Sequence, residues 1–274
     1  MLKVGWIDYA NCSPLLLQIE EQLPKATVSL VHGVPSQLNA ALAAGQIDVC
    51  ISSSIEFARH AEEYLVLPGH CIGSDGPVQS VVLFTSRPVE QLAGEQLLVT
   101  AESATSVVLL QILLARHWQL AGCSVQPTQL PWRQALSGAA GVLLIGDTAL
   151  QASMEGEGCF RYDLGAAWKE MTGLPFVFAL WQVNRAAAVT EAAGLRHLSV
   201  LLDQARDLMP QRLAALAALA PETDWISPER LEDYWRHITY RLDERHLAGL
   251  DCFYHLAAEL GLIQDAIKPE FLAV

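Results

Sequence analysis

The sequence has few cationic side chains for its length. Lys and Arg number 17 against 30 Asp and Glu among 274 residues, which gives a formal net charge of −13. Nucleic acids and anionic membrane surfaces select basic patches, so this charge disfavours both as partners. A small anionic ligand is still compatible with it, because backbone amides can bind an anion without Lys or Arg. We therefore expect a small-molecule ligand.

Common metal and cofactor motifs are also missing. The six cysteines are scattered and none forms a Cys-x-x-Cys pair. This spacing disfavours a metal site or a disulfide framework and predicts reduced, mostly buried thiols. The phosphate-binding loop, the dinucleotide glycine fingerprint and the His-Glu-x-x-His motif do not occur either. We predict that the protein uses no metal and no cofactor.

Long apolar runs are absent as well. No stretch reaches the roughly 20 apolar residues that a membrane-spanning helix needs. The first residues enter a strand pattern at Val4, without the apolar region of a secretory signal. These features predict a cytoplasmic protein with no membrane partner. For the oligomeric state, we expect a monomer or a homodimer.

What is present is a hydrophobic, globular composition, with 52% apolar and 17% charged residues. Strand patterns at Val4–Ile7, Thr27–Val31 and Ile47–Ile51 alternate with helical patterns at Leu15–Leu23 and Ser36–Leu42. Such alternation is typical of an α/β fold with a parallel sheet covered by helices. Ligands in these folds bind beyond the carboxyl ends of the strands.

Two further apolar strands, Ser80–Ser86 and Phe176–Asn184, each follow a turn that contains Gly and Pro. They bracket a block that has strands and helices of its own, which predicts two lobes joined by two crossing strands. We expect residues 1–86 and 185–274 to form the first lobe, with the C-terminal helices packed on it. Residues 87–184 would form the inserted second lobe, and a ligand cleft would lie at the crossing.

Polar side chains occur where these strands end. Asn11 follows the first strand, Ser53 and Ser54 follow the third, and Ser80 interrupts an apolar run. A buried hydroxyl without a partner costs about 1–3 kcal/mol. Ser80 therefore needs a backbone, side-chain or ligand partner, and the sequence does not say which.

Four other residues allow two interpretations each. Thr105 and Ser106 precede an apolar helix, where hydroxyls either cap the helix or help its amides to bind an anion. Asp147 follows the strand Val142–Ile145 and either caps the next helix or faces the cleft. Phe176 either packs in the core or forms a cleft wall for a flat ring. The residue pattern by itself predicts a binding cleft and names no reaction.

Several stretches, in order along the chain, resemble one family. They are Gly5–Leu15, Val31–Asn39, Ile51–Ala58, Ser74–Ser80, Leu144–Asp147, Gly173–Ala179 and Glu244–Leu250. Together they resemble the chorismate dehydratases of the futalosine route to menaquinone. The resemblance runs from near residue 4 to near residue 262, and the Ser-Asp-Gly-Pro-Val stretch is its most specific part.

The resemblance implies a type II periplasmic-binding-protein fold and a hydro-lyase reaction. Chorismate, a dianion, would lose water to give 3-[(1-carboxyvinyl)oxy]benzoate, with aromatisation of the ring as the driving force. The resemblance implicates Asn11 and Ser80 in catalysis. We expect substrate binding by the following residues: Ser53, Ser54, Thr105, Ser106, Asp147 and Phe176.

No protein general base stands out in the sequence. Our hypothesis is that the enolpyruvyl carboxylate of the substrate takes the C3 proton. Two alternatives remain. One is a non-catalytic solute-binding or sensor protein. The other is the sister 1,4-dihydroxy-6-naphthoate synthase, whose histidine base would stand where this chain has Gly146.

Overall fold

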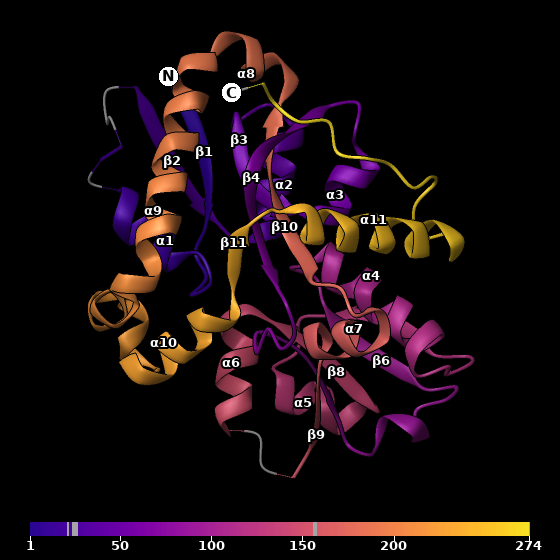
Figure 1. The fold of residues 1–274 in the computed structure, drawn as a ribbon. Coiled ribbons are helices and arrows are strands. Elements are labelled where there is room, and N and C mark those ends of the chain that lie inside the picture. Colours follow the sequence, from indigo (N-terminus) through magenta and orange to yellow (C-terminus); the bar gives the residue numbers. More distant parts are fainter. Residues whose placement is uncertain (21, 24–26, 156–157, 274) are drawn as a thin grey trace.

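The computed structural model describes residues 1–20, 22–23, 27–155 and 158–273. Within them lie two β-sheets covered by helices, one above the other in Figure 1. The first sheet has the strand order β11-β4-β10-β3-β1-β2 and the second has the order β7-β6-β8-β5-β9. We call each sheet with its helices a lobe.

The strands of the first lobe are β1 (Leu2–Ile7), β2 (Val28–Gly33), β3 (Val49–Ser53), β4 (Tyr64–Ser74), β10 (Phe176–Asn184) and β11 (Thr239–Arg241). Those of the second lobe are β5 (Val81–Thr85), β6 (Gln96–Thr100), β7 (Ser124–Thr128), β8 (Gly141–Ile145) and β9 (Phe160–Asp163). The N-terminal helices are α1 (Ser13–Ile19), α2 (Pro35–Ala43) and α3 (Ser54–Arg59).

The predicted parallel arrangement of the first strands is confirmed. β1 pairs in parallel with both β2 and β3. Both α1 and α2 carry a proline in their first turn, where the missing N–H is not needed. The carboxyl ends of β1 and β3 consequently lie at one edge of the sheet, and that edge faces the second lobe.

The chain passes between the lobes at its two Gly- and Pro-containing turns. β4 and β10 lie side by side as an antiparallel pair in the first sheet, while β5 pairs with β8 and β9 in the second. The boundaries that we predicted from the sequence therefore need correction. β5 lies before residue 86 but belongs to the second lobe, and β10 lies before residue 185 but belongs to the first. The apolar strands follow the turns at which the chain crosses and do not themselves cross.

The second lobe contains α4 (Ala104–Ile112), α5 (Trp132–Gly138), α6 (Gly146–Glu155) and α7 (Leu164–Thr172). The C-terminal region contains α8 (Arg185–Thr190), α9 (Ala192–Leu219), α10 (Pro228–His237) and α11 (Glu244–Glu259). Short helical turns lie at Val89–Gln91, Leu113–His117 and Pro221–Asp224.

The C-terminal helices pack mainly on the first lobe, as predicted. α9 packs against α1 and β4, α10 packs against α9, and α11 packs against β10 and α4 (Figure 1). A large hydrophobic core joins these elements, and Trp6, Trp181 and Trp235 are each 1% exposed within it. None of the helices in the described ranges combines the length and the apolar character that a bilayer crossing requires.

Candidate active site

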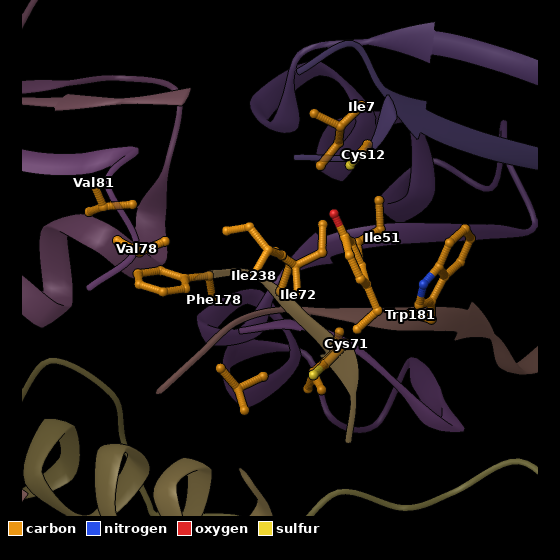
Figure 2. Packing of buried hydrophobic residues seen from close by; sticks show 14 of the residues in the cluster. Ile7, Cys12, Ile51, Cys71, Ile72, Val78, Val81, Phe178, Trp181 and Ile238 are labelled. Carbon is orange, nitrogen blue, oxygen red and sulfur yellow. The ribbon is translucent and has the colours of Figure 1, made fainter. Parts of the chain in front are cut away.

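A small cavity lies where the two lobes meet, and residues from both lobes line it. Its volume is about 60 Å³. The polar lining comes from Tyr9, Asn11, Ser53, Ser80, Ser103 and Ser106, and the apolar lining includes Ile7, Ile72, Val78, Val81 and Phe178. Figure 2 shows these five apolar residues within the buried hydrophobic cluster. The cavity is therefore an apolar slot with a few hydroxyl and amide groups.

Four of the residues singled out from the sequence line this cavity: Asn11, Ser53, Ser80 and Ser106. They come from the loop after β1, the end of β3, the turn before β5 and the start of α4, so the fold brings together residues that are distant in the chain. The Asn11 side chain has a buried Oδ1 that accepts no hydrogen bond from any described residue. A buried acceptor of this kind needs a partner, and a ligand in the cavity could supply it.

Ser80 is 2% exposed and sits at the entry to β5. Its Oγ accepts a hydrogen bond of 2.9 Å from the hydroxyl of Tyr234 on α10. Among the described residues, its own proton has only a long contact of 3.4 Å, to the carbonyl of Val78. The main chain is fixed as well, because the carbonyl of Ser80 accepts from the N–H of Gly146 at 2.8 Å.

The turn that precedes Ser80 is held by the carboxylate of Asp163. The backbone N–H groups of Val78 and Gln79 donate to its Oδ2 at 3.0 and 2.6 Å. Gln79 has a φ of +61°, which is costly for a residue with a side chain. Asp163 also caps α7 by accepting from Ala166. Burial raises the pKa of Asp163. This carboxylate keeps the strained turn, and with it Ser80, in place.

The start of α4 forms the other polar side of the cavity. Ser103 caps the helix, since its Oγ accepts from the N–H of Ser106 at 3.2 Å. The Ser103 hydroxyl donates in turn to the Ser106 Oγ at 2.9 Å, so the proton of Ser106 is available to a ligand. Sequence reasoning missed Ser103, although a Ser three residues before Ser106 is a recognisable capping pattern.

Ser54 and Thr105 do not line the cavity, contrary to what we predicted. Ser54 donates from Oγ to the carbonyl of Val177 at 2.8 Å, and Thr105 Oγ1 accepts from the N–H of Ile55 at 3.1 Å. Both hydroxyls are used to join α3 to β10 and α4 behind the cavity. Both hydroxyls therefore have protein partners in this structure, and their contact with a substrate stays a prediction.

Phe176 is likewise a core residue. Its ring packs edge-on against Trp168 and Phe253, with centroid separations of 5.1 and 4.9 Å. The aromatic residue in the cavity lining is Phe178, two positions further along β10. Of the two interpretations that the sequence left open for Phe176, this structure shows the core position.

Asp147 stands directly behind the cavity and is not among its lining residues. Its Oδ1 accepts from the N–H of Ala10 at 2.9 Å, which links α6 of the second lobe to the loop after β1. The pKa of Asp147 is raised to about 6, mainly by burial and also by the charge of Glu222, while the hydrogen bond from the Ala10 N–H opposes the shift. Asp147 thus connects the two lobes in this structure, and its contact with a substrate stays a prediction.

Tyr9 is a lining residue that sequence reasoning missed. Its hydroxyl donates to Oε2 of Glu102 in the second lobe at 2.7 Å. Its ring lies on Gly146, where a Cβ would come within 3.0 Å of the ring carbons. Gly146 also has a φ of +57°, which disfavours any side chain. A side chain is therefore disfavoured at this position.

Comparisons with known proteins identify the family of this chain. A family model described as menaquinone biosynthesis matches residues 2–259. The chorismate dehydratase of Thermus thermophilus is 32% identical over 278 residues, which cover 94% of this chain and 95% of that protein. The chorismate dehydratase of Campylobacter jejuni is 33% identical over 179 residues, covering 64% of each chain.

Solved structures show the same fold at low sequence identity. A protein of Archaeoglobus fulgidus matches with a TM-score of 0.77 and 17% identity, covering 96% of this chain and 98% of that one. The periplasmic aliphatic sulphonate binding protein of Escherichia coli matches with a TM-score of 0.68 and 18% identity, covering 100% and 94%. The fold is that of periplasmic binding proteins, as predicted, and the chain belongs to the menaquinone biosynthesis family.

Proposed function

We propose that this protein is a chorismate dehydratase, which removes water from chorismate to give 3-[(1-carboxyvinyl)oxy]benzoate. The observation that carries the proposal is the 32% identity to a chorismate dehydratase over 94% of the chain. The cavity geometry supports it, because Asn11 and Ser80 meet there with the serines of α4.

Admission of the substrate requires the lobes to separate. Ligand pockets usually measure about 300–1,000 Å³, whereas this cavity measures about 60 Å³. Hydrogen bonds between described residues connect the lobes around it, among them those from Tyr9 to Glu102, from Ala10 to Asp147 and from Ile55 to Thr105. We infer that the structure represents a closed form, and that opening breaks these bonds.

The chemistry is an elimination across C3 and C4 of the substrate ring. The C3–H bond breaks, its electron pair becomes the new ring double bond, and the C4–O bond breaks with loss of the hydroxyl. The departing proton and hydroxide together make water, and the ring becomes aromatic. The enzyme must orient the ring and stabilise negative charge on oxygen, which fixed hydrogen-bond donors do best. We assign this role to Asn11 and Ser80.

The lining contains no His, Lys, Asp or Glu within the part of the chain that the structure describes. Tyr9 lines the cavity, but burial and the adjacent Glu102 raise its pKa above the ordinary value, so the phenol stays protonated and does not serve as the proton acceptor. This composition supports the hypothesis that the enolpyruvyl carboxylate of the substrate accepts the C3 proton. Replacing that carboxylate with a neutral amide should abolish turnover and leave binding measurable. Full turnover of the amide would contradict the hypothesis.

We assign one substrate carboxylate to the start of α4. Ser103 and Ser106 line the cavity there, at the N-terminus of the helix. Such a site binds an anion without a cationic side chain. Ser53 lies in the first lobe and is the remaining serine of the lining, so we assign it a contact on that side.

We also propose that the protein acts in the cytoplasm. All six cysteines are free thiols, and Cys12, Cys50 and Cys71 are buried. Free thiols in this number fit a reducing compartment. The assignment agrees with a role in cofactor biosynthesis.

The test is to mix the purified protein with chorismate and to follow ring absorbance and product mass. We expect the loss of one water, strongly reduced in Asn11→Ala and in Ser80→Ala. Tight binding of chorismate without a change in mass would make the protein a solute-binding protein. Absence of binding would overturn the substrate assignment and leave the fold in place.

A further inference from the structure

One short C-terminal segment makes hydrogen bonds to both loops that carry Asn11 and Ser80. Tyr234 donates to the Ser80 Oγ at 2.9 Å, and Tyr240 donates to the carbonyl of Asn11 at 2.7 Å. Trp235 donates from Nε1 to the carbonyl of Ala10 at 2.6 Å. These three donors come from α10 and β11, far from both loops in the sequence (Figure 1).

The bond from Tyr234 has a chemical consequence that the two others lack, because it ends on a side-chain hydroxyl. A serine hydroxyl has one proton to donate and two lone pairs that accept. Tyr234 occupies one lone pair of Ser80, so the tyrosine is the donor and Ser80 the acceptor. The proton of Ser80 is left with its 3.4 Å contact to Val78, whose carbonyl already accepts the backbone N–H of Ser80 at 2.7 Å.

We propose that Tyr234 is a positioning residue for the dehydration, which directs the Ser80 proton at an oxygen of the bound substrate. The proposal rests on the proposed function. A chain of two hydrogen bonds, from Tyr234 to Ser80 and from Ser80 to the substrate, also polarises its second bond. Tyr234 is 1% exposed and burial raises its pKa, so the phenol stays a donor over the working pH range.

The substitution Tyr234→Phe tests this role, because it removes the donor and keeps the ring. Without the phenol, the lone pairs of Ser80 lose their donor and the hydroxyl turns toward Val78 for part of the time. We expect kcat for chorismate to fall about 10-fold, less than the loss on removing a direct donor. KM should change less than 2-fold. A kcat equal to that of the wild type would overturn the proposal.

Tyr254→Phe is the matched control. Tyr254 is fully buried like Tyr234, and its hydroxyl donates to the carbonyl of Ser54 at 2.6 Å, behind the cavity. Both variants lose one buried hydroxyl, so both should lower Tm by a similar amount. If the fall in kcat merely reflects weaker packing, Tyr254→Phe will show it too, and that result would also overturn the proposal.

A double variant distinguishes action through Ser80 from any other action of Tyr234. If Tyr234 works by directing the Ser80 proton, Tyr234→Phe should have no further effect in a Ser80→Ala background. If the fall in kcat of the double variant equals the product of the falls in the two single variants, the proposal is contradicted. The dissociation constant for the product can be measured in the wild type, the two single variants and the double variant. It tests the same coupling between Tyr234 and Ser80 without turnover. Failure of the proposed function would be seen separately, as a wild-type protein that does not convert chorismate.

Discussion

The two polar sides of the cavity are built in different ways. On one side, Asn11 and Ser80 stand on loops that are held by α10, β11 and the carboxylate of Asp163, all distant in sequence. On the other side, Ser103 and Ser106 are held by each other within the first turn of α4. The first side depends on tertiary structure and the second on local structure.

This difference suggests different tasks. Long-range bonds fix the position and direction of a group, which matters most for oxygen atoms whose charge changes during the reaction. A helix N-terminus attracts negative charge wherever the helix forms, which suits a carboxylate that stays charged throughout. We therefore expect the Asn11 and Ser80 side to determine kcat, and the Ser103 and Ser106 side to determine KM.

The largest effect should follow removal of a donor on the first side. Loss of one fixed donor to a developing charge typically costs about 100- to 1,000-fold in kcat. We expect Ser80→Ala and Asn11→Ala each to fall in this range, with KM within about 3-fold of the wild type. Steady-state kinetics with chorismate measures both constants. If these two variants instead raise KM and leave kcat unchanged, the assignment of kcat to one side and KM to the other is wrong.

The next largest effect should come from Gly146→Ala. This substitution disturbs the contact of Gly146 with Tyr9, which joins the lobes next to the cavity. Its Cβ would lie 3.0 Å from carbon atoms of the Tyr9 ring. Displacement of that ring would narrow the cavity and weaken the bond to Glu102. We expect kcat/KM to fall about 50-fold, since small misplacements near a reacting centre cost up to about 100-fold.

Gly45→Ala is the control for backbone strain. Gly45 has a φ of +65°, close to that of Gly146, and a Cβ there would meet nothing within 4 Å. Both variants should therefore lose a similar amount of stability, and only Gly146→Ala should lose activity. Equal loss of kcat/KM in the two variants would show that contact with Tyr9 is unimportant.

Ser106→Ala tests the second side and should have a smaller effect. The variant keeps the Ser103 cap and loses one hydroxyl beside the proposed carboxylate. A hydrogen bond to a charged group contributes about 1.5–3 kcal/mol, so we expect KM to rise about 10-fold with kcat within about 2-fold. Kinetics at several chorismate concentrations separates the two constants. A loss of kcat as large as that of Ser80→Ala would mean that both sides act on the transition state.

The same difference explains what could be predicted from the sequence. Ser106 was found because helix starts are marked locally, and Asn11 and Ser80 were found because strand ends and a family resemblance mark them. Tyr234 and Tyr240 carry no local signal, since on a helix and a short strand they look like ordinary core aromatics. Their role becomes visible only when the fold brings α10 and β11 to the cavity.

Strand β4 shows why part of the fold was missed. It contains Pro68 and Gly69, which usually argue against a strand. The pairing with β10 accommodates both residues by a bulge, as the register shifts between Leu180 opposite Cys71 and Gln182 opposite Val66. Gly69 takes a φ of +79° within it. Such a bulge interrupts the alternation of apolar and polar residues, so this strand could not be predicted from the sequence.

The smallest effect should be a pH-dependent change in stability at Asp147, which connects the lobes without lining the cavity. Burial raises its pKa to about 6 in the folded protein, above the value of about 4 of a free carboxyl. Between these values the folded state binds more protons than the unfolded state, so this group lowers stability as pH rises from 4 to 6. Asp147→Asn removes the charge and keeps an acceptor for Ala10. We therefore expect its Tm, relative to the wild type, to be about 3 °C higher at pH 7.5 than at pH 4.5. A Tm difference independent of pH would show that the carboxylate is not desolvated, and that the contact between the lobes is looser in solution.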